Sequence, residues 1–475
     1  MPTFPKSPHY RRIADMLRLT LLSGTLQPGD RMISARKLAE REQVSLPTAL
    51  EALRYLEAEG LISARPRSGY FVSHESQPDV THHTQHMPGP ISVSMSVVAR
   101  SLFSRTDAKL VPLGAALPDP KWLPVDTLQR SLQAVSRRLD ARGQSYSLPP
   151  GLPELRNKIA ARSALWGASF SARDLVITTG ATQSLRLALS AVCNKGDIVA
   201  IEHPAYFGVL LLLEELGLKA LQITTDPIEG LLLEPLADAI RSHQLAAILT
   251  SPTVQNPLGA SMALARKKAL VSLIERAGIP LIEDDVYGDL AGNGLRPPAC
   301  KAFDQLGNVI YCSSLSKTLA PGWRIGWIAG GRYHEKILQA RLAGDWAGTP
   351  LLESAASLIL SNGEYDRHLR RLKSRISKSI QIVVQLVRSC FPKGTRISPP
   401  VAGYLLWVEL PKMINAIDVY HQSLQLGISV SPGNLFSPGG EFNNYLRLNC
   451  ANEPTPELLH ALKNVGKICH QLSRI

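Results

Sequence analysis

After residue 112 the sequence alternates between short apolar segments and helical patterns, which indicates an α/β body built on a mainly parallel sheet. Several of the apolar segments have the length and character of buried strands and are followed at once by a polar motif, namely 175–177, 247–250, 278–282 and 309–311. Charged helices such as 364–378 then lead into a smaller C-terminal lobe. Strands are predicted in that lobe at 404–409 and 445–449.

Length and composition limit the class of protein. A chain of 475 residues has room for more than one domain and a large core, and its 45% hydrophobic and 19% charged content is ordinary for a globular protein. No apolar run approaches the ~20 residues that cross a bilayer, and the N-terminus lacks the apolar core of a signal peptide. Six scattered cysteines without Cys-x-x-Cys spacing indicate reduced thiols. We therefore expect a cytoplasmic protein with no membrane association and no metal site.

The net charge of +13 suits a polyanionic partner such as nucleic acid. Residues 1–74 contribute eleven lysines and arginines against seven acidic residues. A basic surface without a partner would give the same totals. Charge alone therefore does not decide between these two interpretations.

The first 74 residues have the pattern of three helices followed by two short strands. Apolar residues at four-residue spacing predict a helix over 9–24, and Ser34 can cap a second helix that ends near Glu42. Ser45 can cap a third, with Pro47 in the first turn, where its missing amide costs nothing. Strands are predicted on both sides of Gly69. This order is typical of a winged helix-turn-helix, although a helical cap on the body is the alternative.

The sequence of this segment resembles the GntR family of bacterial regulators. The matching motifs are Leu26-x-Pro-Gly-Asp-Arg31, Ser34-x-Arg36-x-Leu-Ala39, Val44-Ser45 and Gly60-Leu-Ile62. The resemblance implies binding to double-stranded DNA. The third helix would enter the major groove by Ser45, Leu46, Pro47 and Thr48, while Arg36 would contact the backbone and the wing would contribute Arg67 and Gly69. Relatives often have arginine where this chain has Leu46, and neither leucine nor proline reads guanine through a bidentate bond.

A second motif, Ser313-Ser-Leu-Ser-Lys317-Thr-Leu-Ala-Pro-Gly-Trp-Arg324, follows the predicted strand 309–311. Such a lysine can form a Schiff base with an aldehyde, and Ser314, Ser316 and Arg324 can hold a phosphate beside it. The alternative is a surface turn with a solvated lysine.

Other motifs accompany it in a fixed order, namely Thr178-Thr-Gly180-Ala181-Thr182-Gln, Glu202-His-Pro-Ala-Tyr206, Ser251-Pro-Thr-Val-Gln-Asn256-Pro and Glu283-Asp284-Asp285-Val-Tyr287. From about residue 112 to its C-terminus the chain resembles the fold-type I aminotransferases, which use pyridoxal 5'-phosphate (PLP). The resemblance implies a large α/β domain with a small C-terminal α+β lobe.

The resemblance also implies a role for each residue of the site. Lys317 would form the internal aldimine, Asp284 would pair with the pyridinium nitrogen, and Asp285 is the rival carboxylate. The remaining ligands are Tyr287 and Asn256 for the phenolic oxygen, Tyr206 for the ring face, and Gly180, Ala181, Thr182, Ser314, Ser316 and Arg324 for the phosphate.

Two further residues carry predictions about partners. Tyr146 matches a tyrosine that reaches the phosphate of a partner subunit, which implies a homodimer through the body, and Arg447 matches an arginine that grips a substrate carboxylate. The sequence departs from its relatives at Ala402-Gly-Tyr-Leu-Leu406, where a second glycine and a histidine are common. That departure leaves the shape of the ligand pocket open.

The combination predicts three parts: a winged helix-turn-helix at 5–74, a flexible linker at 75–110 and an aminotransferase-like domain at 111–475. It resembles the MocR subfamily of bacterial transcriptional regulators, and implies a PLP-dependent DNA-binding regulator that senses the cofactor or an amino-group effector through the internal aldimine. The alternatives are a working aminotransferase with an attached DNA-binding domain and an inactive enzyme fold kept for dimerisation. We expect transamination to be slow or vestigial. The sequence does not name the effector, the operator, the regulated genes or the direction of regulation.

Overall fold

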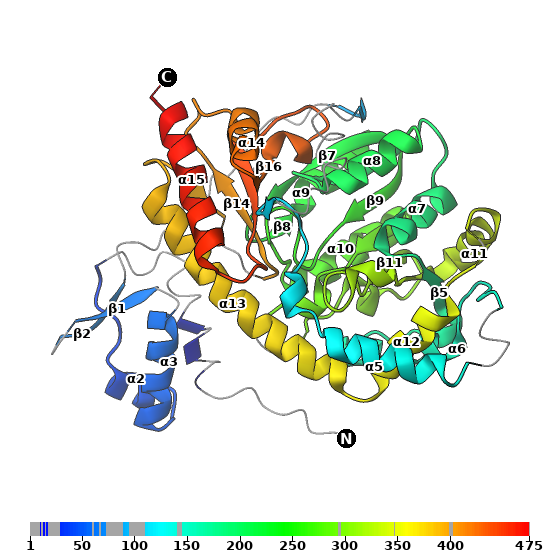
Figure 1. The fold of residues 1–475 in the computed structure, drawn as a ribbon, viewed down its shortest axis with the longest axis horizontal. Coiled ribbons are helices and arrows are strands. Elements are labelled where there is room, and N and C mark those ends of the chain that lie inside the picture. The colour runs from blue at the N-terminus through cyan, green and yellow to red at the C-terminus, as the bar shows by residue number, and fades with distance from the viewer. Residues whose placement is uncertain are drawn as a thin grey trace. The chain divides into compact units, whose positions relative to one another are not determined.

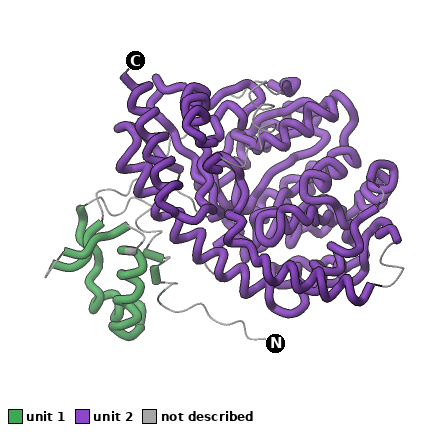
Figure 2. The backbone as a smooth tube through the Cα atoms, viewed as in Figure 1, with its two compact units in different colours: residues 1–80 green, residues 81–475 purple. Residues whose placement is uncertain are grey.

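The computed structural model describes residues 10, 13–14, 16–17, 29–58, 61–65, 68–72, 89–94, 110–139, 145–292, 296–345, 347–398 and 402–474. The chain forms two compact units, residues 1–80 and residues 81–475, which are coloured separately in Figure 2. They are called the head and the body. The boundaries at 74 and 110 derived from the sequence stay predictions.

The head has the predicted order of helices and strands. Its described elements are α2 (Ala35–Arg41), α3 (Leu46–Ala58), β1 (Ile62–Arg65) and β2 (Gly69–Val72), and the two strands pair antiparallel. The predicted first helix is described only at Tyr10, Ile13, Ala14, Met16 and Leu17, all helical. Ser34 accepts a hydrogen bond from the Lys37 amide, and Ser45 accepts one from Thr48, so both predicted caps are present. The winged helix-turn-helix prediction is confirmed for the described part of the head.

A mixed sheet forms the centre of the body. Among the described residues it has nine strands in the order β3-β7-β6-β9-β10-β11-β12-β5, with β8 paired to β7. The strands from β7 to β11 in this order are parallel, whereas β12, β5, β3 and β8 are antiparallel to their neighbours. Their bounds are β3 Ile91–Ser92, β5 Leu175–Thr178, β6 Ile198–His203, β7 Lys219–Asp226, β8 Gly230–Leu231, β9 Leu245–Thr250, β10 Leu281–Asp284, β11 Val309–Ser314 and β12 Gly326–Ala329.

Helices cover both faces of this sheet (Figure 1). Alternate residues of β6 show why: Val199 and Ile201 pack in one apolar cluster with Leu189 of α7, whereas Ala200 packs in another with Leu270 of α10. The helices of this large domain are α5 Val125–Ser136, α6 Pro153–Ser163, α7 Ala181–Val192, α8 Phe207–Glu215, α9 Leu233–Ser242, α10 Leu264–Ala277, α11 His334–Ala343 and α12 Pro350–Ser361.

The small lobe has an antiparallel sheet in the order β13-β14-β17-β16 and a two-stranded parallel sheet of β4 and β15. The bounds are β4 Val111–Pro112, β13 Arg396–Ile397, β14 Leu405–Glu409, β15 Ile428–Ser429, β16 Ser431–Pro432, β17 Tyr445–Asn449, α13 Glu364–Cys390, α14 Ala416–Gln425 and α15 Pro456–Leu472. The 27-residue α13 joins the two parts of the body, because Leu372 packs in the large-domain core and Val387 in the lobe core. Figure 1 shows it running from α12 to the side of α15. The predicted α/β body with a small C-terminal lobe is confirmed.

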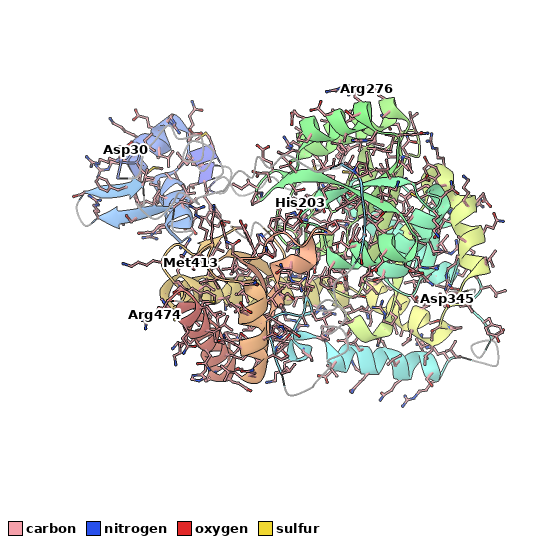
Figure 3. All side chains as sticks on the ribbon, turned by 90° about the horizontal axis from the view of Figure 1, so that it is seen from above. Asp30, His203, Arg276, Asp345, Met413 and Arg474 are labelled. Atoms are coloured by element: carbon pink, nitrogen blue, oxygen red, sulfur yellow. The ribbon has the colours of Figure 1, made fainter. Side chains whose placement is uncertain are left out.

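Figure 3 shows the described side chains as sticks, with Met413 and Arg474 labelled on the small lobe, and His203 labelled at the end of β6, where it is buried. Part of the predicted linker belongs to the body, since β3 pairs with β7 through Ile91 and Ala220. Residues 95–109 of the predicted linker lie outside the described residues. Among the described helices, none combines the length and apolar character that crossing a membrane requires.

Candidate functional site

The predicted site residues follow the carboxyl ends of neighbouring parallel strands. Strand β10 ends at Asp284, β11 leads into the loop that carries Lys317, and their register places Asp284 opposite Cys312. Strand β9 precedes the segment with Asn256, and β6 precedes Tyr206. Because adjacent parallel strands end at one edge of the sheet, segments far apart in sequence meet there.

Lys317 lies partly buried at the centre of this edge. Its Nζ donates a hydrogen bond to the carbonyl oxygen of Ala116 at 2.8 Å and lies 5.9 Å from the centre of the Tyr287 ring. Burial, and then the positive charge of Arg447, lower the pKa of Lys317 to about 8, although Asp284 acts in the opposite direction. A substantial fraction of this amine is neutral near physiological pH, which is the form that attacks an aldehyde.

Two neighbouring carboxylates have different partners. Asp285 pairs with Arg296 and accepts a hydrogen bond from the Tyr311 hydroxyl at 2.9 Å. Asp284 accepts one long hydrogen bond, 3.4 Å from the Val286 amide, and forms no ion pair with the described residues. Burial raises the pKa of Asp284 to about 7, and Asp285 adds to that shift. Asp284 is thus the carboxylate without an ion pair among the described residues, and its pairing with a ring nitrogen stays a prediction.

Arg447 on β17 is a fully buried cation without a carboxylate partner among the described residues. Its Nη1 donates to Asn256 Oδ1 at 3.1 Å, and its Nη2 donates to the Gly114 carbonyl at 2.5 Å and to Ser431 Oγ at 3.3 Å. Its Nε has no partner in the described structure, and burial lowers its pKa. A buried charge held only by neutral groups is costly, so a carboxylate entering here would be bound favourably.

The Tyr287 hydroxyl is a second buried polar group without a hydrogen-bond partner among the described residues. Its ring contacts that of Tyr404, with centres 5.4 Å apart. An acceptor or donor on a ligand between Tyr287 and Asn256 would satisfy it.

The predicted phosphate residues meet at the start of α7. Gly180 has φ of +105°, and a Cβ atom at this position would lie 2.5 Å from Arg324 Nη2, so only glycine lets the arginine approach. Arg324 in turn donates to Ser316 Oγ at 3.3 Å, and Ser314 accepts from the Ser316 amide. The first amides of α7, at Ala181 and Thr182, begin at this place. Positive charge, amides and hydroxyls thus surround one point, as an anion requires.

Tyr206 precedes α8 and lies near the same charges, since Arg447, Asp284 and Arg324 all influence its pKa, which burial raises. A Cβ atom on Gly208 would meet the Tyr206 ring at 2.4 Å, so this glycine makes room for the ring. Tyr146, by contrast, is 68% exposed, on the segment where Ser147 accepts from the Gly348 amide. Its predicted contact with a partner subunit stays a prediction.

The predicted DNA-contacting residues of the head lie at its surface. Arg36, Ser45 and Pro47 are exposed, and Leu46 is 40% exposed at the start of α3. Thr48, half-buried, bonds the Ser45 hydroxyl at 2.8 Å, and Gly69 begins β2 with φ of +99°. Arg67 lies outside the described residues.

Sequence analysis missed four residues of the site. The carbonyl oxygens of Gly114 and Ala116 accept from Arg447 and Lys317, Ser431 contacts Arg447, and the Tyr404 hydroxyl donates to Ala116 at 3.1 Å. The pairing of β4 with β15 brings the first two to the site. Backbone carbonyls have no sequence signature, so only the departure at 402–406 drew attention to this region.

The fold and this constellation define a class of protein: a fold-type I aminotransferase-like body joined to a winged helix-turn-helix head. Residues 115–465 match the family model of aminotransferase class I and II, and residues 9–72 match that of bacterial regulatory proteins, gntR family. The chain therefore belongs to the aminotransferase class I and II family, whose members use PLP, and carries a gntR-family domain that implies DNA binding. This two-part organisation is that of the MocR subfamily of transcriptional regulators.

Individual relatives agree with this assignment. The HTH-type transcriptional regulators YjiR and YdcR of Escherichia coli are each 36% identical to this chain, over 97% of it and 99% of their own length. The kynurenine aminotransferase of Pyrococcus horikoshii, solved in complex with PMP, is 26% identical and superimposes with a TM-score of 0.73 over 80% of this chain and 95% of its own. The relatives that match nearly the whole chain are thus regulators, and the solved enzyme matches the body.

Proposed function

We propose that this protein is a PLP-dependent transcriptional regulator that binds promoter DNA through its head and senses the cofactor or an amino-group effector through its body. One observation carries the proposal. Lys317, with its pKa lowered to about 8, lies in one chain with a gntR-family domain and is surrounded by polar groups that lack partners.

The residues present fit PLP. The unpartnered Tyr287 hydroxyl and Asn256 suit its phenolic oxygen, Asp284 suits its ring nitrogen, and the space that Gly180 leaves beside Arg324 suits its phosphate. When bound, the cofactor supplies an aldehyde that condenses reversibly with amines. The chain supplies the neutral amine of Lys317, the carboxylate that keeps the ring nitrogen protonated, and the apolar surroundings that exclude water.

The proposed effector is an amine that also bears a carboxylate, or PLP itself. Arg447 supports the first choice, because its buried guanidinium donates hydrogen bonds only to neutral oxygens in the described structure and its planar fork matches a carboxylate. We further propose that the protein acts in the cytoplasm as a homodimer formed by the body, with Tyr146 directed at the partner's phosphate. An effector can change DNA affinity only if it binds one arrangement of the heads better than another.

The test is binding of the full-length protein to its own upstream intergenic DNA, measured with and without PLP and with a panel of amino acids and decarboxylated amines. Loaded protein is expected to be yellow, and at least one ligand is expected to change the DNA affinity fivefold or more. Arg447→Ala should remove the response to carboxylated amines and spare cofactor binding, whereas Lys412→Ala, on the surface of the same lobe, should change neither. Colourless protein that PLP does not bind would contradict the cofactor part of the proposal.

A second function is a working aminotransferase with an attached DNA-binding domain. It is favoured by the same convergence of Lys317, Asp284 and Arg447, and by the match of the body to a solved aminotransferase. Sustained conversion of an amino donor and a keto acceptor, combined with a DNA affinity that no ligand changes, would favour this function over the first.

A further inference from the structure

The hydroxyl group of Tyr365, on the first turn of α13, lies between two segments of the lysine site. It is 2.8 Å from Thr318 Oγ1, directly after Lys317, and 2.7 Å from Asp289 Oδ2, two residues after Tyr287. Both Tyr365 and Thr318 are almost completely buried. One hydroxyl thus connects the segment of the lysine with the segment of the predicted ring-oxygen ligand.

The direction of these two hydrogen bonds follows from the groups involved. The guanidinium groups of Arg296 and Arg162 help to hold the pKa of Asp289 below its usual value, so this carboxylate is ionised and can only accept. The Tyr365 hydroxyl has a single proton, and it therefore donates this proton in the hydrogen bond to Asp289. The Thr318 hydroxyl must then donate to the Tyr365 oxygen, which fixes the Thr318 rotamer as well as its position.

His368 holds the same residue from the next position on this face of α13. Its Nε2 lies 2.7 Å from the Thr318 carbonyl oxygen, and because a carbonyl only accepts, Nε2 carries the proton. Burial lowers the pKa of His368, which favours this neutral form. Thr318 is thus held by both its side chain and its backbone.

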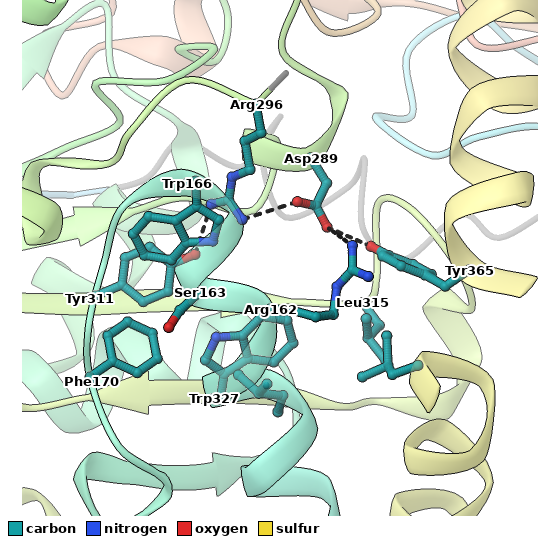
Figure 4. Close-up of a pocket in the computed structure, with 12 residues that line it drawn as sticks. Arg162, Ser163, Trp166, Phe170, Asp289, Arg296, Tyr311, Leu315, Trp327 and Tyr365 are labelled. Carbon is teal, nitrogen blue, oxygen red and sulfur yellow. Dashed lines mark hydrogen bonds and ion pairs between the residues drawn. The ribbon is translucent and has the colours of Figure 1, made fainter. Parts of the chain in front are cut away.

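The other side of Tyr365 is anchored by paired charges. Asp289 bonds Arg296 at 3.0 Å and lies 4.0 Å from Arg162, whose guanidinium stacks 4.4 Å from the centre of the Tyr365 ring. Figure 4 shows Tyr365, Asp289 and the two arginines around a small cavity of about 20 Å³, with Trp166 stacked on Arg296. These pairs leave Tyr365 little freedom to move.

We propose that Tyr365, together with His368, is a positioning residue that fixes Lys317 relative to Tyr287 by holding Thr318. Neither side chain contacts Lys317 directly through a hydrogen bond in the described structure, so each acts through Thr318 and Asp289. The part of this inference that concerns the cofactor rests on the proposed function. The part that concerns the lysine does not, because it can be measured on cofactor-free protein.

The first experiment measures Lys317 itself. Full-length cofactor-free protein is acetylated briefly at a series of pH values, and the modified fraction of the Lys317 peptide is followed by mass spectrometry. In the wild type the midpoint, which is the pH of half-maximal modification of Lys317, is expected near pH 8. In Tyr365→Phe the loop loosens, water reaches the amine, and the midpoint is expected to rise by about one pH unit. Tyr420→Phe, a buried tyrosine in the small lobe, is the matched control and should not move it.

The second experiment tests the path through Thr318. Thr318→Val removes the hydroxyl with little change of volume, and should raise the midpoint as Tyr365→Phe does. The double variant should behave as Tyr365→Phe alone, because that substitution already removes the hydrogen bond that Thr318→Val removes. Additive shifts would mean that Tyr365 acts by another route and would overturn this part of the inference.

The third experiment measures PLP affinity by visible absorption. Tyr365→Phe is expected to weaken it about tenfold, since a buried hydrogen bond of this kind is lost, and Tyr420→Phe should leave it unchanged. Tyr365→Phe could instead lower only the Tm and keep the wild-type modification midpoint of Lys317 and the wild-type PLP affinity. That result would show a purely structural role for Tyr365 and overturn the inference. If the wild type itself binds no PLP, the proposed function fails, and the lysine midpoint still decides this inference.

Discussion

Two buried clusters of charged residues are neighbours in the body, and they differ in whether their charged side chains form ion pairs. The lysine cluster consists of Lys317, Asp284, Tyr287 and Arg447. The Arg296 cluster consists of Arg296, Asp285, Asp289, Tyr311, Arg162 and Tyr365. In the second, each carboxylate contacts a guanidinium. In the first, no two of the charged residues form an ion pair in the described structure, and Tyr287 has an unpartnered hydroxyl.

This difference in ion pairing distinguishes residues that stabilise the fold from residues that are available to bind a ligand. Burial alone does not distinguish the clusters, since Asp284 and Asp285 are neighbours in sequence and both are nearly inaccessible. What distinguishes them is whether their charged groups form ion pairs with one another. Unpaired buried charges destabilise a fold and are kept where a ligand supplies the partner, whereas paired charges hold the surroundings in place.

The largest effect is expected from Lys317→Met, which should abolish trapping of PLP by borohydride. Its effect on the free energy of unfolding should be small or favourable. The pKa of Lys317 is lowered on folding, so at pH 7 the folded state bears the full cost of a buried ammonium, and that cost falls progressively as pH rises from about 8 to the ordinary value of 10.5. Peptide mapping after reduction and thermal unfolding of the cofactor-free protein check both statements. Trapping on another lysine would contradict the assignment.

The comparison of the two clusters is tested directly by Asp285→Asn and Asp284→Asn. Asp285→Asn removes one of the two carboxylates that pair with Arg296 and should lower the unfolding free energy by about 1.5–3 kcal/mol, the range for a hydrogen bond to a charged group. Asp284→Asn should leave the unfolding free energy unchanged or raise it at pH 8, because the pKa of Asp284 is raised to about 7 and its ionised form is costly above that pH.

Urea unfolding of the cofactor-free variants measures this difference, and visible absorption should show that Asp284→Asn is the one that alters the PLP band. Equal destabilisation by the two substitutions would remove the distinction between the clusters.

The rate at which cofactor-free protein captures PLP should depend on pH with a midpoint near 8. Capture needs the neutral amine, so the rate should rise roughly tenfold per unit well below pH 8 and level off above it. Stopped-flow absorption measures the rate. A rate that keeps rising through pH 9, as for an exposed lysine, would show that Lys317 is better solvated than the structure describes.

The smallest effect is expected in the head, from Arg36→Ala. Arg36 is exposed, and removing one phosphate contact should weaken DNA binding for all sequences and lower the slope of log K against log salt by about 1. Fluorescence anisotropy at several salt concentrations measures the slope. Arg276→Ala, an exposed cation of the body, is the control with the same change of net charge, and an equal loss there would mean that bulk charge is responsible.

The sequence by itself determined much of the fold, because its signals are local. Ser34 and Ser45 cap helices of the head through hydrogen bonds to amides three residues away. Apolar runs predicted β10 and β11, and the residues that follow them became the candidates for the site. The resemblance favoured Asp284 over its neighbour Asp285, and the structure places the ion pair with Arg296 on Asp285.

Only the tertiary structure decided which groups complete the site and which of them lack partners. Ala116 is 201 residues from Lys317 in sequence and contributes a backbone carbonyl, which any residue type possesses. Tyr365 reaches Thr318 across 47 residues from a helix that the sequence indicated only as a charged one. Satisfaction of a buried polar group depends on every atom around it in space, and neither residue type nor spacing along the chain contains that information.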